Sequence, residues 1–257
     1  MEYLETLSQM SQPALIAAFL VFVRVGASMA VLPAFGEQTV SVRVRLALTL
    51  AFTAIVFPAV AIDPFILNTS LVVLGPSMLA EVVSGLTIGI IVRLSVMALQ
   101  IAGTIISQST SLSQLFGGGA VDAQPAMGYI LFTAGLALAV TLGLHERIAL
   151  LLIQSYDLFP AGKFPDPRDL SLLMVGHVAH AFALAFSFSG PFLIASVIYN
   201  TALGVINRAM PQLMVALVGA PAITLGGLIL LFLTAPLLLE IWIEHFYRTL
   251  QNPLGIF

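Results

Sequence analysis

The sequence predicts an all-α membrane protein built from long helical hairpins that are broken at Gly-Pro sites. Of its 257 residues, 60% are hydrophobic and 8% are charged, whereas globular domains average about 45–50% apolar and about 25% charged residues. The mean hydropathy is +1.08. About six apolar segments follow one another, most of them as long as the ~20 residues that a helix needs to cross a bilayer.

Composition excludes several classes of function. The chain has no cysteine, so disulfides, thiolate nucleophiles and Cys-ligated metals are excluded. Nine Lys and Arg oppose twelve Asp and Glu for a net charge of −3. The basic residues are dispersed, so we expect no nucleic acid partner. The N-terminus lacks the positively charged region and cleavage site of a secretory signal, and we expect the first apolar helix to be retained.

The first two apolar runs cover residues 13–32 and 46–62. The first is long enough to cross a hydrocarbon core of ~30 Å as a helix, and Arg24 lies near its middle. Residues 33–37, Pro-Ala-Phe-Gly-Glu, break the pattern before Arg43 and Arg45 open the second run. A helical hairpin follows from this order.

The third run, from residue 71 to about residue 106, is too long for one perpendicular crossing and must bend, tilt or leave the bilayer. Gly85 and Gly89 have the small-xxx-small spacing that lets helix backbones approach closely. Glu81 and Arg93 would lie ~18 Å apart along a continuous helix. Each therefore needs a different partner, and another chain is one source.

Residues 107–125 differ from their surroundings because they are rich in Ser, Thr and Gln and then in Gly. Three consecutive glycines, residues 117–119, impose almost no backbone preference. A solvent-exposed connector is one interpretation. The apolar side chains of Leu112, Leu115 and Phe116 favour the other, a loop that closes or lines something.

The fourth run covers residues 126–144, and a polar stretch at 154–169 is expected to be the largest extramembrane loop. His145-Glu146 does not begin a metalloprotease motif, because Ala149 stands where the second histidine is required. A partner could bind the polar stretch, although solvation alone explains its composition.

The fifth run, residues 170–206, would measure ~55 Å as one helix. Ser189-Gly190-Pro191 at its centre predicts a split into two helices or a re-entrant hairpin. His177 and His180 share a helix face, as metal ligands or a proton relay would, but no carboxylate accompanies them in this segment. A packed or interfacial pair is the favoured interpretation.

A polar interruption, residues 207–212 (Asn-Arg-Ala-Met-Pro-Gln), separates the fifth run from the sixth, residues 213–239. Pro211 lacks an amide hydrogen and disfavours helix at the residue before it, so one helix should end near Asn207 and another should start at about Pro211. Gln212 would lie in its first turn. Beyond the run, Glu240, Glu244 and Arg248 recur every four residues and extend the last helix.

These residues leave two functions open. No catalytic group, metal-ligand spacing or phosphate-binding loop is present, so no enzyme activity, cofactor or metal is expected. Breaks at Gly75-Pro76, Gly190-Pro191 and residues 219–221 would suit a secondary transporter with discontinuous helices. Charged residues with no evident partner in the same chain would suit a subunit of a larger assembly; they are Arg24, Glu81, Arg93 and Arg208.

Two stretches carry a resemblance to a known family. Residues 207–213 followed by Val218-Gly219-Ala220-Pro221 resemble the C-terminal signature of the FliR/SctT family, the export-gate components of flagellar and virulence-type type III secretion systems. The N-terminal pattern is similar, with Arg24, Pro33 and Phe35 before residues 42–48 (Val-Arg-Val-Arg-Leu-Ala-Leu). The similarity covers essentially the whole chain, and the flagellar branch is favoured.

The resemblance implies one export-gate domain over residues 1–257 and a role without catalysis. In the family, the subunit joins FliP-type and FliQ-type subunits in a helical gate in the bacterial inner membrane, at the flagellar basal body, through which unfolded substrates pass. FlhB-type and FlhA-type proteins and membrane lipid are further expected partners. The resemblance also implies that residues 107–125 form a pore plug. Within it, we expect Phe116, Leu112 and Leu115 to close the pore by apolar contact, and Gly117, Gly118 and Gly119 to form the hinge for gating.

The remaining expected site residues would contact neighbouring subunits. They are Arg24, Glu81, Arg93, Asn207, Arg208, Pro211, Gln212, Gly219 and Pro221. The chain departs from the family pattern at Ser109-Thr110-Ser111-Leu112 and at Asp122-Ala123-Gln124-Pro125 within the plug. Leu217 and Ala220 stand where aromatic residues are often found in the family.

Overall fold

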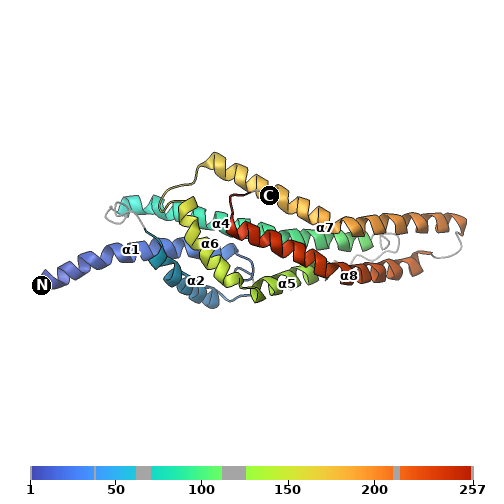
Figure 1. Cartoon of the computed structure of the whole chain (residues 1–257), viewed down its shortest axis with the longest axis horizontal. Coiled ribbons are helices and arrows are strands. Elements are labelled where there is room, and N and C mark those ends of the chain that lie inside the picture. The colour runs from blue at the N-terminus through green and yellow to red at the C-terminus, as the bar shows by residue number, and fades with distance from the viewer. Residues whose placement is uncertain (1, 38, 62–70, 112–125, 211–214, 256–257) are drawn as a thin grey trace. The chain divides into compact units, whose positions relative to one another are not determined.

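The computed structural model describes residues 2–37, 39–61, 71–111, 126–210 and 215–255, where all regular structure is helical (Figure 1). The elements are α1 (Glu2–Val31), α2 (Val42–Val56), the 3₁₀ turn η1 (Phe57–Ala59), α4 (Leu71–Ser111), α5 (Ala126–Thr141), α6 (Leu144–Leu158), α7 (Pro167–Ala209) and α8 (Val215–Gln251). Five helices among these residues are long and apolar enough to cross a membrane, or up to six if α5 and α6 form one broken span. The predicted all-α membrane fold is confirmed.

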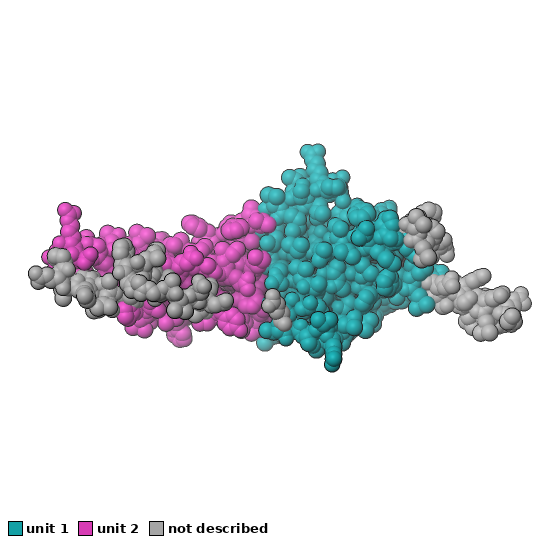
Figure 2. All heavy atoms as spheres, turned by 180° about the vertical axis from the view of Figure 1, so that it is seen from behind, with its two compact units in different colours: residues 1–94, 140–177, 247–257 teal, residues 95–139, 178–246 magenta. Residues whose placement is uncertain are grey.

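The chain divides into two compact units (Figure 2). Unit 1 contains residues 1–94, 140–177 and 247–257, and unit 2 contains residues 95–139 and 178–246. The division falls inside α4, α7 and α8, so each of these helices contributes one part to each unit.

In unit 1, the buried residues of α1 recur at the helical period. Leu20, Val21, Val25 and Met29 are fully buried, as expected for one apolar stripe of a helix. The first half of α4 packs against this stripe so closely that there is no space for a side chain at two of its positions, Gly85 and Gly89. A Cβ atom at Gly85 would overlap the Arg24 carbonyl oxygen, and one at Gly89 would lie 2.9 Å from the Ser28 carbonyl oxygen. The predicted close approach at these two glycines is confirmed.

The break predicted at residues 33–37 is also confirmed. Gly36 occupies a turn in which a Cβ atom would lie 2.6 Å from the Ala30 carbonyl oxygen. The Arg45 guanidinium donates to the carbonyl oxygens of Phe35 at 3.4 Å and Glu37 at 3.1 Å. Helix α2 then begins with a Ser41 cap, whose hydroxyl accepts from the Val44 amide. Arg45 thus orders the turn between α1 and α2.

Unit 2 has an aromatic centre. Trp242 and Phe246 of α8 are buried and stack with their ring centroids 4.9 Å apart. The Trp242 indole N–H donates to the Ser95 carbonyl oxygen at 2.9 Å, and a Cβ atom at Gly135 would lie 3.3 Å from the indole ring. Small residues also let α4 and α5 touch, because a Cβ atom at Gly103 would overlap the backbone of Gly128.

The predicted breaks are wrong at all three sites. Helix α4 continues through Pro76 and α7 continues through Pro191. The residue before each proline is glycine, which has no Cβ atom to clash with the proline ring. A membrane helix tolerates the lost hydrogen bond where neighbouring groups replace it. At the third site, Pro221 likewise lies inside α8.

The polar loop is shorter than residues 154–169. Helix α6 extends to Leu158 and α7 begins at Pro167, because the Asp166 carboxylate caps the first turn of α7 by accepting from the Arg168 amide at 2.8 Å. Helix α7 ends at Ala209, close to the predicted end at Asn207. The extension of the last helix through the charged repeat is confirmed, since α8 reaches Gln251.

Replacement of Gly85 by alanine should lower the thermal stability of the purified chain in detergent, because the new methyl group would overlap backbone atoms of α1. The matched control is Gly204→Ala in α7, where no atom lies within 4 Å of a Cβ. That control should be neutral or stabilising by up to about 1 kcal/mol, from helix propensity. Equal melting temperatures for Gly85→Ala and the parent chain would contradict the close packing of α1 and α4.

Candidate functional site

A buried ion pair joins α1 and α4 in unit 1. Arg24 Nε donates to Glu81 Oε2 at 2.6 Å, and Arg24 Nη2 donates to Glu81 Oε1 at 3.1 Å. Both side chains are completely buried. This is a bidentate ion pair, in which two charge-assisted hydrogen bonds join one guanidinium to one carboxylate.

Other groups complete the hydrogen bonding of the pair. Arg24 Nη1 donates to the Ser155 carbonyl oxygen at 3.2 Å, and Nη2 donates to the Phe159 carbonyl oxygen at 2.8 Å. The Arg24 guanidinium carbon lies 3.7 Å from the centre of the Tyr156 ring. The Gly162 amide donates to Glu81 Oε1 at 2.7 Å. The pair therefore connects α1 and α4 with the end of α6 and the turn that follows it.

From the sequence we expected Arg24 and Glu81 to have no partner within the chain. That expectation is wrong, because the two residues pair with each other. They are 57 residues apart, and only packing of α1 on α4 makes them neighbours. Buried charges are expensive unless they are paired and hydrogen-bonded, and both conditions hold here. The assignment of these two residues to contacts between subunits thus loses the observation on which it was based.

Arg93 also has partners within the chain. Its Nη1 atom donates to the Val31 carbonyl oxygen at 3.1 Å, at the end of α1, and lies 3.7 Å from Glu37 Oε1. The expectation that Glu81 and Arg93 have different partners is confirmed, while the expectation that Arg93 lacks an internal partner is wrong. Both arginines fasten α4 to the N-terminal hairpin.

Arg208 differs from these arginines. It lies with Asn207 in the last turn of α7, where both side chains are exposed. No described residue forms a hydrogen bond or ion pair with the Arg208 side chain. A cation is favourable at a helix C-terminus, but that position alone does not neutralise it. Pro211 and Gln212, predicted beside it, lie outside the described residues.

Gly219 belongs to a contact between α7 and α8 within unit 2. Tyr199 donates its hydroxyl hydrogen to the Gly219 carbonyl oxygen at 2.9 Å, and a Cβ atom at Gly219 would lie 2.9 Å from Leu203 Cδ1. Pro221 is exposed on α8. The structure therefore gives Gly219 a role inside the chain and leaves Pro221 available at the surface.

The predicted plug residues, Leu112, Leu115, Phe116 and Gly117 to Gly119, lie outside the described residues. The helix that leads to them is anchored, because Ser196 of α7 donates to the Ser109 carbonyl oxygen at 2.6 Å. This contact fixes the start of the connector within unit 2.

The two histidines of α7 have separate surroundings. His177 is buried, with Nε2 2.8 Å from the Pro253 carbonyl oxygen. The His180 ring stacks on that of His245 in α8, with centroids 5.8 Å apart. Among the described residues, no group of three or more His, Asp or Glu side chains is arranged to hold a metal ion.

Sequence reasoning missed the groups that complete the buried network, namely Ser155, Tyr156 and Gly162. All three contribute backbone atoms or an aromatic face, and such contacts leave no signature in the sequence.

Comparison with known families now decides the class of this protein. Residues 15–249 match the family described as bacterial export proteins, family 1. The chain belongs to this family. The resemblance noted at residues 207–221 and at the N-terminal arginines is thereby confirmed.

Similar members of the family carry the name flagellar biosynthetic protein FliR. The protein of that name from Caulobacter vibrioides is 32% identical over 237 residues, which are 91% of this chain and 94% of the relative. The one from Aquifex aeolicus is 30% identical over 239 residues, 92% of each chain. The one from Escherichia coli is 25% identical over 235 residues, 90% of this chain and 88% of the relative.

Replacement of Glu81 by glutamine should destabilise this export protein by about 3–5 kcal/mol, because it leaves Arg24 buried without a counter-charge. Thermal unfolding in detergent measures the effect. The double variant Arg24→Met, Glu81→Met should recover much of the loss, since it buries no charge.

The control for the loss of a carboxylate is Glu146→Gln, whose side chain is 78% exposed. It should unfold like the parent chain, because exposed ion pairs contribute little. If Glu81→Gln behaved like this control, the ion pair would not stabilise unit 1.

Proposed function

We propose that the chain is a non-catalytic component of the flagellar type III export gate in the bacterial inner membrane. Together with P-type and Q-type subunits it forms the pore through which unfolded substrates leave the cytoplasm. The observation that carries the proposal is membership of the bacterial export family over residues 15–249, with relatives named flagellar biosynthetic protein FliR. FlhB-type and FlhA-type proteins complete the proposed apparatus.

The surface of unit 2 supports a role in assembly. Both α7 and α8 expose large apolar side chains, among them Ile194, Val197, Ile198 and Val205 on α7 and Leu225, Phe232, Leu233 and Leu237 on α8. Lipid alone would cover such surfaces. Arg208 lies next to this apolar surface on α7, and a cation facing hydrocarbon is costly. A neighbouring subunit that carries a hydrogen-bond acceptor for Arg208 would both cover the apolar surface and pair with the cation.

The transporter alternative has lost its support. It depended on discontinuous helices, whose exposed ends bind substrates and ions in such proteins. Helices α4, α7 and α8 run continuously through the glycine and proline positions that were expected to break them. No described feature favours solute transport over export.

A tagged copy of the full chain, extracted in mild detergent from cells that express the other gate subunits, should elute as a large complex containing P-type and Q-type subunits. Mass photometry and protein identification check this. A monodisperse single chain that binds or moves a small solute would contradict the gate proposal and restore the transporter.

Arg208→Ala should reduce recovery of the P-type subunit at least tenfold in the same experiment, because a buried intersubunit pair contributes about 3–5 kcal/mol. Arg168→Ala is the matched control, since Arg168 is an exposed arginine in the first turn of the same helix. Equal recovery for the two variants would remove Arg208 from the interface.

We also propose that residues 107–125 form a plug that closes the pore, and this part of the proposal is based on the resemblance to the family. Phe116, with Leu112 and Leu115, would close the pore by apolar contact, and residues 117–119 would let the plug withdraw. Deletion of residues 116–119 should raise ion conductance through the assembled gate in planar bilayers. Deletion of an equal length within the 62–70 segment is the control, and unchanged conductance in the plug deletion would count against gating.

A further inference from the structure

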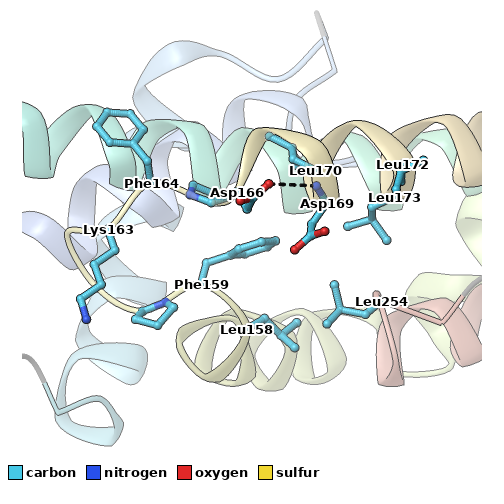
Figure 3. Close-up of a pocket in the computed structure, with 12 residues that line it drawn as sticks. Leu158, Phe159, Lys163, Phe164, Asp166, Asp169, Leu170, Leu172, Leu173 and Leu254 are labelled. Atoms are coloured by element: carbon cyan, nitrogen blue, oxygen red, sulfur yellow. Dashed lines mark hydrogen bonds between the residues drawn. The ribbon is translucent and has the colours of Figure 1, made fainter.

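Unit 1 contains a hollow to which the proposed export role assigns no function. It measures about 570 Å³ and lies between the end of α6, the turn after it, the start of α7 and the C-terminal residues (Figure 3). Pockets for small molecules have volumes of about 300–1,000 Å³. The hollow is thus large enough for a ligand.

The buried ion pair holds one wall of this hollow. Phe159, whose side chain lines it, is fixed through its carbonyl oxygen by Arg24, and the Gly162 amide is fixed by Glu81. Between them, the Lys163 amide donates to the Pro160 carbonyl oxygen at 3.2 Å. Because fully buried groups fasten both ends of the turn, the wall is formed before any ligand arrives.

The hollow is apolar inside and carries both signs of charge at its rim. Phe159, Leu170, Leu173 and Leu254 line it, and the exposed groups Lys163, Asp166 and Asp169 border it. Figure 3 shows the Phe159 ring between the Lys163 side chain and the Asp169 carboxylate.

Of the two carboxylates at the rim, Asp166 uses one oxygen atom to cap α7. Asp166 Oδ1 accepts from the amides of Arg168 and Asp169 and so caps α7. Its second oxygen remains for a ligand, as does the Asp169 carboxylate, which forms no side-chain hydrogen bond with described residues.

The position of the hollow in the sequence points to an amphiphile. The candidate membrane span of α7 begins at Pro167, and the charged turn precedes it directly. A polar turn followed directly by an apolar helix is an order typical of segments at the membrane–water interface. A ligand that is apolar at one end and carries both charges at the other matches this arrangement.

We propose that this hollow binds a zwitterionic phospholipid with a primary ammonium headgroup. The Lys163 ammonium contacts the phosphate, the carboxylates of Asp166 and Asp169 accept hydrogen bonds from the headgroup ammonium, and an acyl chain packs on Phe159, Leu173 and Leu254. Two carboxylates against one lysine disfavour a purely anionic lipid, and Lys163 opposes a basic peptide.

Native mass spectrometry of the full chain, with the subunits that co-purify, tests this proposal by titration with phosphatidylethanolamine, phosphatidylglycerol and phosphatidylcholine. Phosphatidylethanolamine should bind at least fivefold more tightly than the other two. Phosphatidylglycerol has no ammonium group, and the quaternary ammonium of phosphatidylcholine has no N–H to donate. Equal affinities for all three lipids would overturn the assignment.

Three variants locate the binding. Leu254→Trp, at a half-exposed position that fills the hollow, and Asp169→Asn should each weaken binding of phosphatidylethanolamine at least fivefold. Glu146→Gln, an exposed carboxylate outside the hollow, should leave it unchanged. Unchanged binding in both hollow variants would overturn the proposal.

A protein occupant is the remaining outcome. A photo-crosslinking amino acid at Leu254 in cells should capture phospholipid. Capture of another export subunit at that position would overturn the lipid proposal and show that a peptide segment occupies the hollow. Neither result depends on the export function, because export and complex formation are measured separately.

Discussion

The buried contact between Arg24 and Glu81 is the interaction on which unit 1 depends. A guanidinium and a carboxylate in an apolar surrounding are tolerable only when each finds its counter-charge and its remaining hydrogen-bond partners. Here these partners come from α1, α4, α6 and the turn after α6. Because no element can move away without exposing a charge to hydrocarbon, the pair specifies one arrangement of these elements more than it adds stability.

Glycines make that contact geometrically possible. Gly85 and Gly89, one and two turns after Glu81, bring the backbone of α4 against that of α1 at Arg24 and Ser28. Ser28 adds a hydrogen bond to the Gly85 carbonyl oxygen at 2.9 Å. In a bilayer, where apolar helices gain little from leaving lipid, such close approach and interhelical hydrogen bonding drive association. The same device recurs in unit 2, where Gly103 and Gly128 join α4 to α5.

Four arginines of this chain occupy two kinds of position. Arg24 and Arg93 bind carboxylates and carbonyl oxygens within unit 1 and hold α1 against α4. Arg45 binds two carbonyl oxygens of the turn between α1 and α2. Arg208 is exposed at the end of a long apolar helix, next to side chains such as Val205 that are also exposed. An internal arginine builds the subunit, whereas an exposed one beside apolar surface is suited to joining subunits.

The sequence by itself determined the helical membrane fold, the turn at residues 33–37, the end of α7 near Asn207 and the family, because hydropathy and short motifs are local properties. It also placed the close approach at Gly85 and Gly89. The tertiary structure alone decided which charges meet: Arg24 and Glu81 are 57 residues apart, and their pairing depends on how α1 packs on α4. It also decided that helices continue through Pro76 and Pro191, since packing and a preceding glycine outweigh the local tendency of proline to end a helix.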